Sequence, residues 1–216
     1  LDQSAVQDLD AGDLVNDAIT YTATDGSTQQ ITVTITGTDD ASVITGTVAG
    51  AVNEGNLGDT VTATGSIAIT DADDDDSPVF NDVGSTVGDN AYGSFALSSS
   101  TWTYTLDQSA VQNLDVGDVV NDTIIYTATD GSTQQITVTI TGSEDAAVIG
   151  GTDTGVVTQD VDPDLDGFLE TGGTLTVSDP DAGESLFAAG LVAGVYGDIT
   201  IDAAGNWTYA ADNSQA

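Results

Sequence analysis

The amino-acid sequence predicts an all-β fold of tandem, seven-stranded antiparallel β-sandwiches, and three observations predict it. Segments in which aliphatic and hydroxyl side chains alternate recur along the chain, and a period of two is typical of half-buried strands. Turn signals separate these segments roughly every 8 to 15 residues, as in sandwich domains. The same segments return after about 105 residues, which is the size of a domain and too long for a solenoid unit.

One repeated stretch fixes the register of the units. The letters YTATDGSTQQITVTITG occur at residues 21–37 and again, unchanged, at 126–142. Residues 1–37 align with 106–142 with five differences, at an offset of 105. We therefore expect the second half of one unit in residues 1–42, a complete unit in 43–147 and the first half of a third in 148–216. The chain would then be a window on a longer array.

Seven strands are expected in the complete unit, at residues 43–52, 65–70, 79–83, 93–97, 101–106, 119–129 and 133–141. A single helical turn is expected within 108–114. The last strand is the clearest, because Ile136, Val138 and Ile140 alternate with threonines. An Asp-Gly turn joins it to the strand before it, and this dipeptide favours a tight hairpin.

The aromatic residues of the strand at 101–106 are expected in the core. Trp102 and Tyr104, with Leu106, would face the opposite sheet and close the sandwich. Trp102 and its counterpart Trp207 are interpreted as core anchors in preference to ligand-stacking platforms. The exposed threonines are attributed to the ordinary strand preference of threonine. A flat hydroxyl array for ice or sugar is disfavoured, because one such strand per unit cannot extend into a plane.

Composition excludes several classes of function. The formal net charge is −36, and the chain has no Lys, Arg, His or Cys. Nucleic acid is excluded as a partner because no cationic side chain can displace phosphate counterions. No apolar run approaches the roughly 20 residues that span a membrane, so insertion is not expected. The chain is not expected to be an enzyme, since only an acidic pair acting on a glycosidic bond would remain.

Acidic residues gather in loops that an immunoglobulin-like strand order would place at the two ends of a unit. Five of the six residues at 71–76 are acidic, and no cationic side chain exists to pair with them. The third unit keeps the Asp-x-Asp spacing of Asp71 and Asp73 in Asp179 and Asp181, with Glu184 in place of Asp76. A hard cation with six to eight oxygen ligands suits such loops, and without His or Cys zinc and copper do not. The sequence therefore predicts Ca²⁺.

Two calcium sites between neighbouring units are expected. The first would use Asp39, Asp40, Asp71, Asp73 and Asp130. The second would use Glu54, Glu144, Asp145, Asp179 and Asp181. A separate signal lies at 160–167, where Asp162, Asp164 and Asp166 precede Gly167 as at the start of an EF-hand loop. The twelfth position is Gly173 where an EF-hand has Glu, and Glu170 as a substitute leaves this third site an open alternative.

Four stretches carry a family resemblance: TGTDDASVITG, SDPDAGES, YGDITIDAAGNWTYAADNS and YTATDGSTQQITVTITG. Together they resemble the VCBS and cadherin-like repeats of giant bacterial surface adhesins of the RTX type. The resemblance implies a calcium-bound sandwich, secretion by a type I system, and a role in biofilm formation or host attachment. The family's Asn-Asp-Ala-Pro linker appears at 39–42 and 144–147, without its proline in either copy.

The expected function is that of a structural extender, or stalk, in a secreted bacterial adhesin or extracellular fibre, made rigid by calcium between its repeats. Its partners would be neighbouring repeats, while a glycan or host surface would be met by other parts of the full protein. The expected location is extracellular, at the bacterial surface or secreted. Two alternatives stay open: a glycan- or ligand-binding sandwich module, and a filament subunit in which residues 148–216 of one molecule fold with residues 1–42 of the next.

Overall fold

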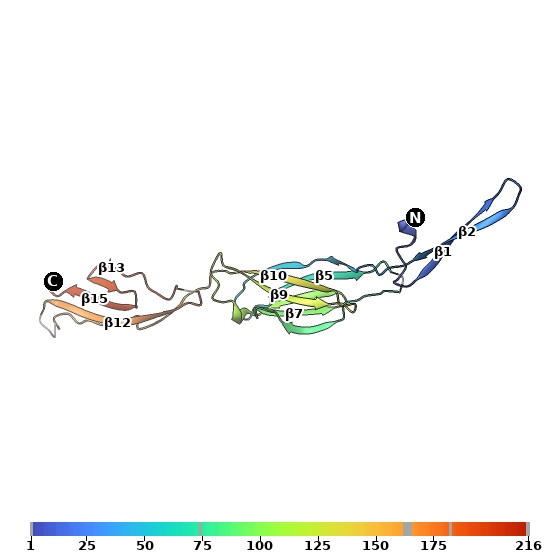
Figure 1. Ribbon diagram of the computed structural model, residues 1–216. Coiled ribbons are helices and arrows are strands. Elements are labelled where there is room, and N and C mark those ends of the chain that lie inside the picture. The colour runs from blue at the N-terminus through green and yellow to red at the C-terminus, as the bar shows by residue number, and fades with distance from the viewer. Residues whose placement is uncertain (1, 74, 162–165, 182, 215–216) are drawn as a thin grey trace. The chain divides into compact units, whose positions relative to one another are not determined.

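A computed structural model describes residues 2–73, 75–161, 166–181 and 183–214. Apart from two 3₁₀ turns, η1 (Gln3–Ala5) and η2 (Gln108–Ala110), its regular elements are β-strands (Figure 1). The strand pairs are antiparallel, so the all-β prediction is confirmed. None of the described helices is long and apolar enough to cross a membrane. The chain forms two compact units, and the repeat boundaries expected from the sequence stay a prediction.

The N-terminal part is the predicted hairpin. Strands β1 (Leu14–Thr22) and β2 (Thr28–Thr36) pair along their whole length and form a sheet of their own. The turn uses Gly26 at φ +89°, a conformation that suits glycine. The Asp25 carboxylate accepts hydrogen bonds from the backbone N–H and the hydroxyl of Ser27, at 2.9 and 2.7 Å. The Asp-Gly signal in the sequence thus located the turn correctly.

The central part holds two sheets. The larger has the order β3-β5-β8-β7-β6, with bounds Val43–Gly46, Thr62–Thr70, Thr101–Leu106, Gly93–Ser98 and Val83–Val87. The smaller has the order β4-β10-β9, with bounds Ala49–Asn53, Thr133–Thr141 and Val119–Thr127. The chain passes from one sheet to the other and back, since β4 lies in the smaller sheet between β3 and β5 of the larger, and this is typical of a sandwich.

The described residues of the central part form eight strands where seven were expected, and two predicted strands need correction. The predicted strand at 43–52 is split into β3 and β4, which belong to different sheets. Gly46 permits the break because its φ is +123°, and a Cβ there would lie 2.1 Å from the Ser66 carbonyl oxygen. The strand predicted at 79–83 was misplaced: Phe80 makes only an isolated bridge with Ala128, and a register shift within β6 obscures the alternation after Val83.

The core of the central part is as predicted. Trp102 and Tyr104 are fully buried, and the Trp102 indole N–H donates to the Thr47 carbonyl at 2.7 Å. The Tyr104 ring lies 4.6 Å from that of Phe95, centroid to centroid. From the smaller sheet, three side chains of β10 are completely buried: Ile136, Val138 and Ile140. The interpretation of Trp102 as a core anchor is therefore confirmed.

A buried carboxylate was not predicted. Asp122 has no exposed surface, although no cation pairs with it in a chain that has none. It accepts hydrogen bonds from the backbone N–H groups of Asn90 and Gly93, both at 3.0 Å, and from the Tyr104 hydroxyl at 3.2 Å. These donors offset the cost of burying the charge. Burial and the Asp122 charge together raise the pKa of Tyr104, which keeps its hydroxyl protonated as a donor.

The C-terminal part is a single sheet with the order β11-β12-β15-β14-β13. Its bounds are Val148–Gly151, Phe168–Ser178, Asn206–Asp212, Asp198–Ile201 and Gly190–Ala193. The Trp207 indole N–H donates to the Thr152 carbonyl at 2.6 Å, which reproduces the bond from Trp102 to Thr47 one repeat earlier. Trp207 is buried, as its interpretation as a core anchor requires.

Candidate metal centre

The linker between β2 and β3 is fastened to the loop that follows β5. The backbone N–H of Asp40 donates to Asp73 Oδ2 at 2.6 Å. The loop holds its own bend, because the Asp73 N–H donates to Asp71 Oδ1 at 3.1 Å. Ser42 adds a third tie, since its hydroxyl bonds the carboxylates of Asp71 and Asp130 at 2.7 and 2.5 Å. Backbone N–H groups and a hydroxyl thus supply the hydrogen bonds to these carboxylates, in a chain that has no cationic side chains.

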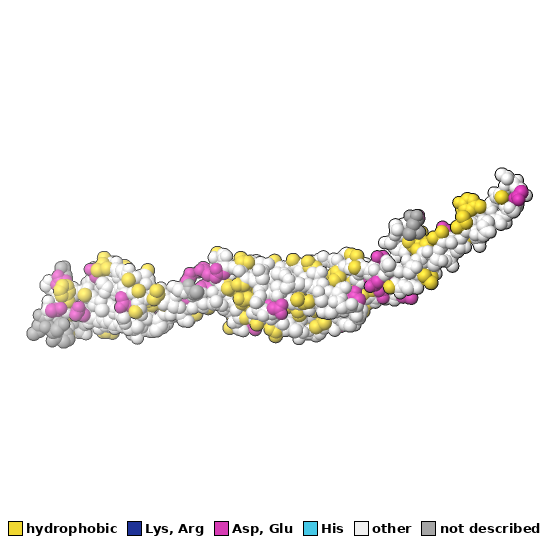
Figure 2. Space-filling model, viewed as in Figure 1, with side chains coloured by type: hydrophobic (Ala, Val, Ile, Leu, Met, Phe, Trp, Pro, Cys, Tyr) yellow, Lys and Arg dark blue, Asp and Glu magenta, His cyan; other side chains and the backbone are white. Residues whose placement is uncertain are grey.

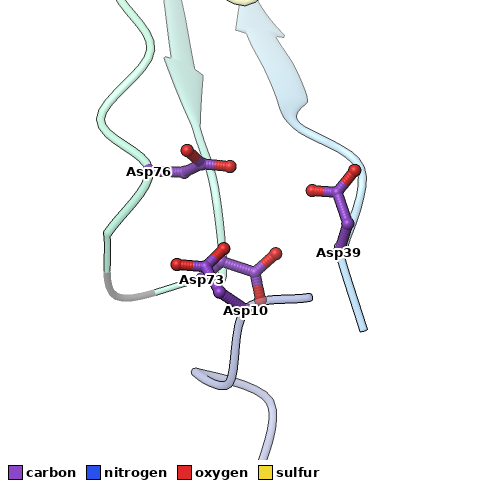
Figure 3. Close-up of side chains that lie close together, drawn as sticks. All are labelled: Asp10, Asp39, Asp73 and Asp76. Atoms are coloured by element: carbon purple, nitrogen blue, oxygen red, sulfur yellow. The ribbon is translucent and has the colours of Figure 1, made fainter. Parts of the chain in front are cut away.

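Four carboxylates converge next to this linker (Figure 3). One oxygen from each lies within 4.8 Å of those of the other three: Asp10, Asp39, Asp73 and Asp76. They come from the segment after η1, the linker, and the loop after β5. Asp73 is only 3% exposed, and within the described residues its Oδ1 accepts no hydrogen bond. A buried carboxylate oxygen without a partner is costly unless something positive lies beside it.

A second group consists of two overlapping sets that share Asp181. Asp115, Glu144 and Asp181 lie within the same distance limit of one another, and so do Asp179, Asp181 and Glu184. Asp181 is 2% exposed, and its Oδ1 has no hydrogen-bond partner in the described ranges. The backbone contacts also match those of the first group. The N–H of Asp145 donates to Asp181 Oδ2 at 2.8 Å, and the Asp181 N–H donates to Asp179 Oδ1 at 2.9 Å.

The two groups use equivalent positions of the repeat. Asp10 and Asp39 of the first correspond to Asp115 and Glu144 of the second, at the repeat offset of 105. Asp73 and Asp76, in the loop after β5, correspond to Asp181 and Glu184 in the loop after β12. The same buried oxygen lacks a partner in both copies, at Asp73 and at Asp181. This recurrence distinguishes the two groups from acidic residues that happen to lie close together on a surface.

Mutual repulsion perturbs these carboxyl groups. Burial and then the charges of Asp73 and Asp76 raise the pKa of Asp10. The pKa of Glu184 is raised first by the charge of Glu144 and then by burial. In contrast, the hydrogen bond from the Ser42 hydroxyl lowers the pKa of Asp130. The charged form of Asp130 is therefore stabilised by its hydrogen-bond donors, whereas the charged forms of Asp10 and Glu184 are destabilised.

The predicted residues fall into two classes. Asp39 and Asp73 lie in the first convergent group, and Glu144, Asp179 and Asp181 in the second. The others lie beside them without converging on the same point. Asp40, Asp71 and Asp130 line a hollow of about 540 Å³ together with Asp39 and Asp76. Asp145 contributes its backbone N–H to Asp181, while its Oδ2 is buried without a described partner.

Glu54 occupies a special place beside the second group. Its carboxylate accepts from the Ser143 N–H and from the Gln112 side chain, both at 3.1 Å. Burial raises its pKa first, and the charges of Asp145 and Asp181 raise it further. Glu54 thus holds the linker at Ser143 by a hydrogen bond, and the negative charges of Asp145 and Asp181 act on it. It is not itself a member of the second group.

Sequence reasoning missed Asp10, although a signal for it existed. Asp10 and Asp115 are unchanged between the two copies of the repeat, whereas Asp8 corresponds to Asn113. The carboxylate at the changed position is outside both groups. Of the EF-hand-like signal, Asp162 and Asp164 lie outside the described residues. Asp166 is described, and its Oδ1 accepts from the Phe168 N–H at 2.9 Å.

The donor chemistry of both groups fits a hard divalent cation. All ligands on offer are carboxylate oxygens, which are the preferred ligands of Ca²⁺ and are poor for zinc or copper without His or Cys. A cation would supply the positive charge that the unpartnered oxygens of Asp73 and Asp181 lack. Asp39, Asp73 and their counterparts Glu144 and Asp181 would hold it.

In metal-free solution, we expect the chain to lose stability as pH rises above the ordinary carboxyl pKa values of 3.8 for Asp and 4.5 for Glu. A raised carboxyl pKa means that the folded state binds a proton more tightly than the unfolded state. The stability that each such group contributes to the fold is therefore lost as pH rises through its folded pKa. Glu54 and Asp145 contribute in this direction, as do Asp10, Asp76 and Glu184. Groups with lowered values, such as Asp71 and Asp130, act in the opposite sense only at still lower pH.

Urea unfolding with a chelator at several pH values measures this dependence. Glu54→Gln should weaken the pH dependence, because it removes one carboxyl with a raised pKa. Stability that instead rises steadily from pH 5 to 7 would contradict the assignment.

Comparison with known proteins gives no family for the chain. No family model matches, and no curated protein matches it. Among solved structures, the extracellular cadherin domains 1–4 of protocadherin gamma B7 match at 16% identity and a TM-score of 0.46, covering 98% of this chain and 50% of that one. A Ca²⁺-stabilised adhesin that helps an Antarctic bacterium bind ice matches at 16% identity and a TM-score of 0.27, covering 93% and 49%.

A third match is a 1.5-MDa bacterial ice-binding adhesin, at 17% identity and a TM-score of 0.28, covering 93% of this chain and 64% of that one. The chain therefore spans less than two thirds of the length of each of these proteins. All three TM-scores lie below 0.5, so the assignment of the candidate site depends on the geometry described above.

Proposed function

We propose that the chain is a set of structural extender repeats from an extracellular adhesin or fibre, and that calcium at the two acidic groups makes it rigid. One observation carries the proposal: three equivalent acidic positions converge twice, and each time a buried oxygen, of Asp73 or Asp181, has no hydrogen-bond partner among the described residues. The positions are Asp10, Asp39 and Asp73 in the first group and Asp115, Glu144 and Asp181 in the second. Neighbouring repeats are its proposed partners. A surface or glycan would be met by other parts of the full protein.

The sequence positions of the ligands explain how a cation would stiffen a junction. Asp10 belongs to the repeat before the linker, Asp39 to the linker itself, and Asp73 to the repeat after it. A cation bound by all three would hold the two repeats in one orientation. Without a cation, the like charges repel one another, and the hydrogen bonds from the Asp40 N–H and the Ser42 hydroxyl oppose the repulsion.

The proposed setting is outside the cell. We expect dissociation constants of roughly 10⁻⁴ to 10⁻³ M, as for the Ca²⁺ sites of extracellular modules. The absence of His, Cys, Lys and Arg favours a mechanical role over a catalytic one. We place the chain at the bacterial surface or in a secreted fibre that serves adhesion or biofilm formation.

Small-angle X-ray scattering with and without calcium tests the proposal. We expect calcium to narrow the distribution of maximum dimensions and to increase the mean, because it removes bending at the junctions. Sodium chloride at equal ionic strength is the control, since it screens the repulsion without bridging the carboxylates. An identical profile in calcium and in chelator would refute the extender mechanism.

A further inference from the structure

The central part shows how this sequence covers a sheet. The β9–β10 hairpin packs its apolar side chains on the β3-β5-β8-β7-β6 sheet, and Val138 is fully buried there. Gly50 lies between the layers, because a Cβ on it would be 2.8 Å from the Trp102 ring and 3.5 Å from Val138. The hairpin therefore meets the sheet around the tryptophan.

The β1–β2 hairpin has the same apolar side chains, but in the described chain they are exposed to solvent. Its strand β2 has the same nine letters as β10, yet Ile31 is 51% and Val33 57% exposed, while their counterparts in β10 are buried. Hydrophobic side chains lie at the surface of this hairpin in Figure 2. The hairpin pairs with no other strand in the described chain.

The C-terminal sheet has an apolar face that no second sheet covers in the described residues. It reproduces the larger central sheet, because a Cβ on Gly155 would lie 2.9 Å from the Trp207 ring, just as one on Gly50 would lie against Trp102. No second sheet in the described residues pairs with it. Its apolar face instead borders a hollow of about 510 Å³, lined by Val157, Leu175, Ile199, Ile201, Trp207 and Tyr209 among others.

A polar feature makes the match specific. In the central part, the Gly93 N–H and the Tyr104 hydroxyl hold the buried carboxylate of Asp122. Gly197 and Tyr209 reproduce that pair: a Cβ on Gly93 would lie 2.5 Å from the Tyr104 hydroxyl, and one on Gly197 2.7 Å from the Tyr209 hydroxyl. The Tyr209 hydroxyl makes no hydrogen bond to any described residue.

The carboxylate that corresponds to Asp122 is Asp17 of β1, one repeat offset earlier. Asp17 is exposed in the β1–β2 hairpin, directly opposite Val33 in the strand register. The hairpin thus presents both the apolar side chains and the acid that the C-terminal sheet is built to receive.

We propose that the apolar face of the β11-β12-β15-β14-β13 sheet binds the β1–β2 hairpin of a second copy of this chain. Val33 then takes the place beside Trp207 that Val138 takes beside Trp102. The Asp17 carboxylate accepts from the Gly197 N–H and the Tyr209 hydroxyl. Because the donor and the acceptor surfaces are different, each copy keeps one of each, and the contact builds linear head-to-tail assemblies.

This association does not depend on calcium, so it can be tested separately from the extender function. Measurements in chelator and in moderate salt, which screens the repulsion between chains of charge −36, isolate the apolar contact. Light scattering coupled to gel filtration should show a mean mass that rises with protein concentration above the 21.7 kDa of one chain.

Two blocked variants give the sharpest test. Val33→Asp disables the hairpin and Ile199→Asp disables the sheet, and both side chains are exposed, so neither change removes a core contact. Each variant alone should stay at 21.7 kDa, while an equimolar mixture should form a dimer of twice that mass and nothing larger. Gln30→Asp adds the same charge on the outward face of β2, where the equivalent Gln135 is exposed, and should assemble like the wild type.

The outcomes decide the proposal in either direction. A wild-type chain of constant monomeric mass, whether its hairpin stays free or folds back on its own sheet, overturns it. Variants that still associate alone place the contact on another face and overturn it too. A mixture that remains monomeric does the same. Tyr209→Phe should weaken the wild-type association, because the buried carboxylate loses one of its two donors.

Discussion

We expect Asp73→Asn to lower the calcium affinity proposed for the first acidic group by roughly tenfold or more, and Asp181→Asn to do the same for the second. Each substitution removes the negative charge of the most buried ligand. The remaining amide oxygen can still accept from the linker N–H of Asp40 or Asp145, so the local backbone has no reason to rearrange. Isothermal titration calorimetry measures the loss for each group.

The same substitutions should change stability in opposite directions with and without calcium. In chelator, Asp73→Asn should stabilise the chain, because it relieves repulsion from Asp10, Asp39 and Asp76 and replaces an unpartnered buried oxygen. In calcium, it should destabilise the chain, because a bound ligand stabilises the folded state according to its affinity. Thermal unfolding under both conditions gives the two signs.

Asp8→Asn is the matched control for the first group. It removes one charge two residues from Asp10, and the second copy of the repeat already has Asn113 at this position. We expect it to leave calcium affinity within about twofold of the wild type, as distant surface charges are screened. An Asp73→Asn variant that behaves like Asp8→Asn would exclude the first group as a calcium site.

The fold was predictable where side-chain alternation is strict. Residues 136–141 alternate without interruption, and β10 has the predicted bounds, 133–141. The break at Gly46 was missed, because apolar residues resume at Val48 and only the tertiary contact with Ser66 requires the change of sheet. The start of β6 was missed for a related reason, since its register shift disrupts the period of two on which the prediction depended.

The candidate site was predictable in its location and less so in its membership. The loop at 71–76 is visible from composition alone, whereas composition does not separate Asp10, which joins the group, from Asp8 and Asp13, which do not. Asp122 shows a different limit. It shares the inward face of β9 with Ile124 and Tyr126, so the period of two places it in the core. Ordinary rules for charged side chains place it in water, and only the donors from other strands decide between the two.

Strands β2 and β10 have the same sequence but differ in burial, so equivalent substitutions in the two strands measure how much burial contributes to stability. Ile136 in β10 is fully buried, while Ile31 at the equivalent position of β2 is 51% exposed. Ile136→Ala should therefore destabilise the central part by about 2–5 kcal/mol, through lost apolar contacts and the cavity left behind. Ile31→Ala should change stability by no more than about 0.5 kcal/mol, as exposed substitutions usually do.

Urea unfolding followed by tryptophan fluorescence measures the difference, because Trp102 lies in the core that Ile136 helps to form. The protein must be dilute, so that any association through the β1–β2 hairpin is absent. Ile31→Ala then serves as the control, because it makes the same chemical change in a strand of identical sequence. Equal losses for the two variants would mean that the β2 face is covered in solution, and the exposure described for the hairpin would be wrong. A large loss for Ile136→Ala alone would show that burial against the opposite sheet, and not the repeated sequence itself, determines what each isoleucine contributes.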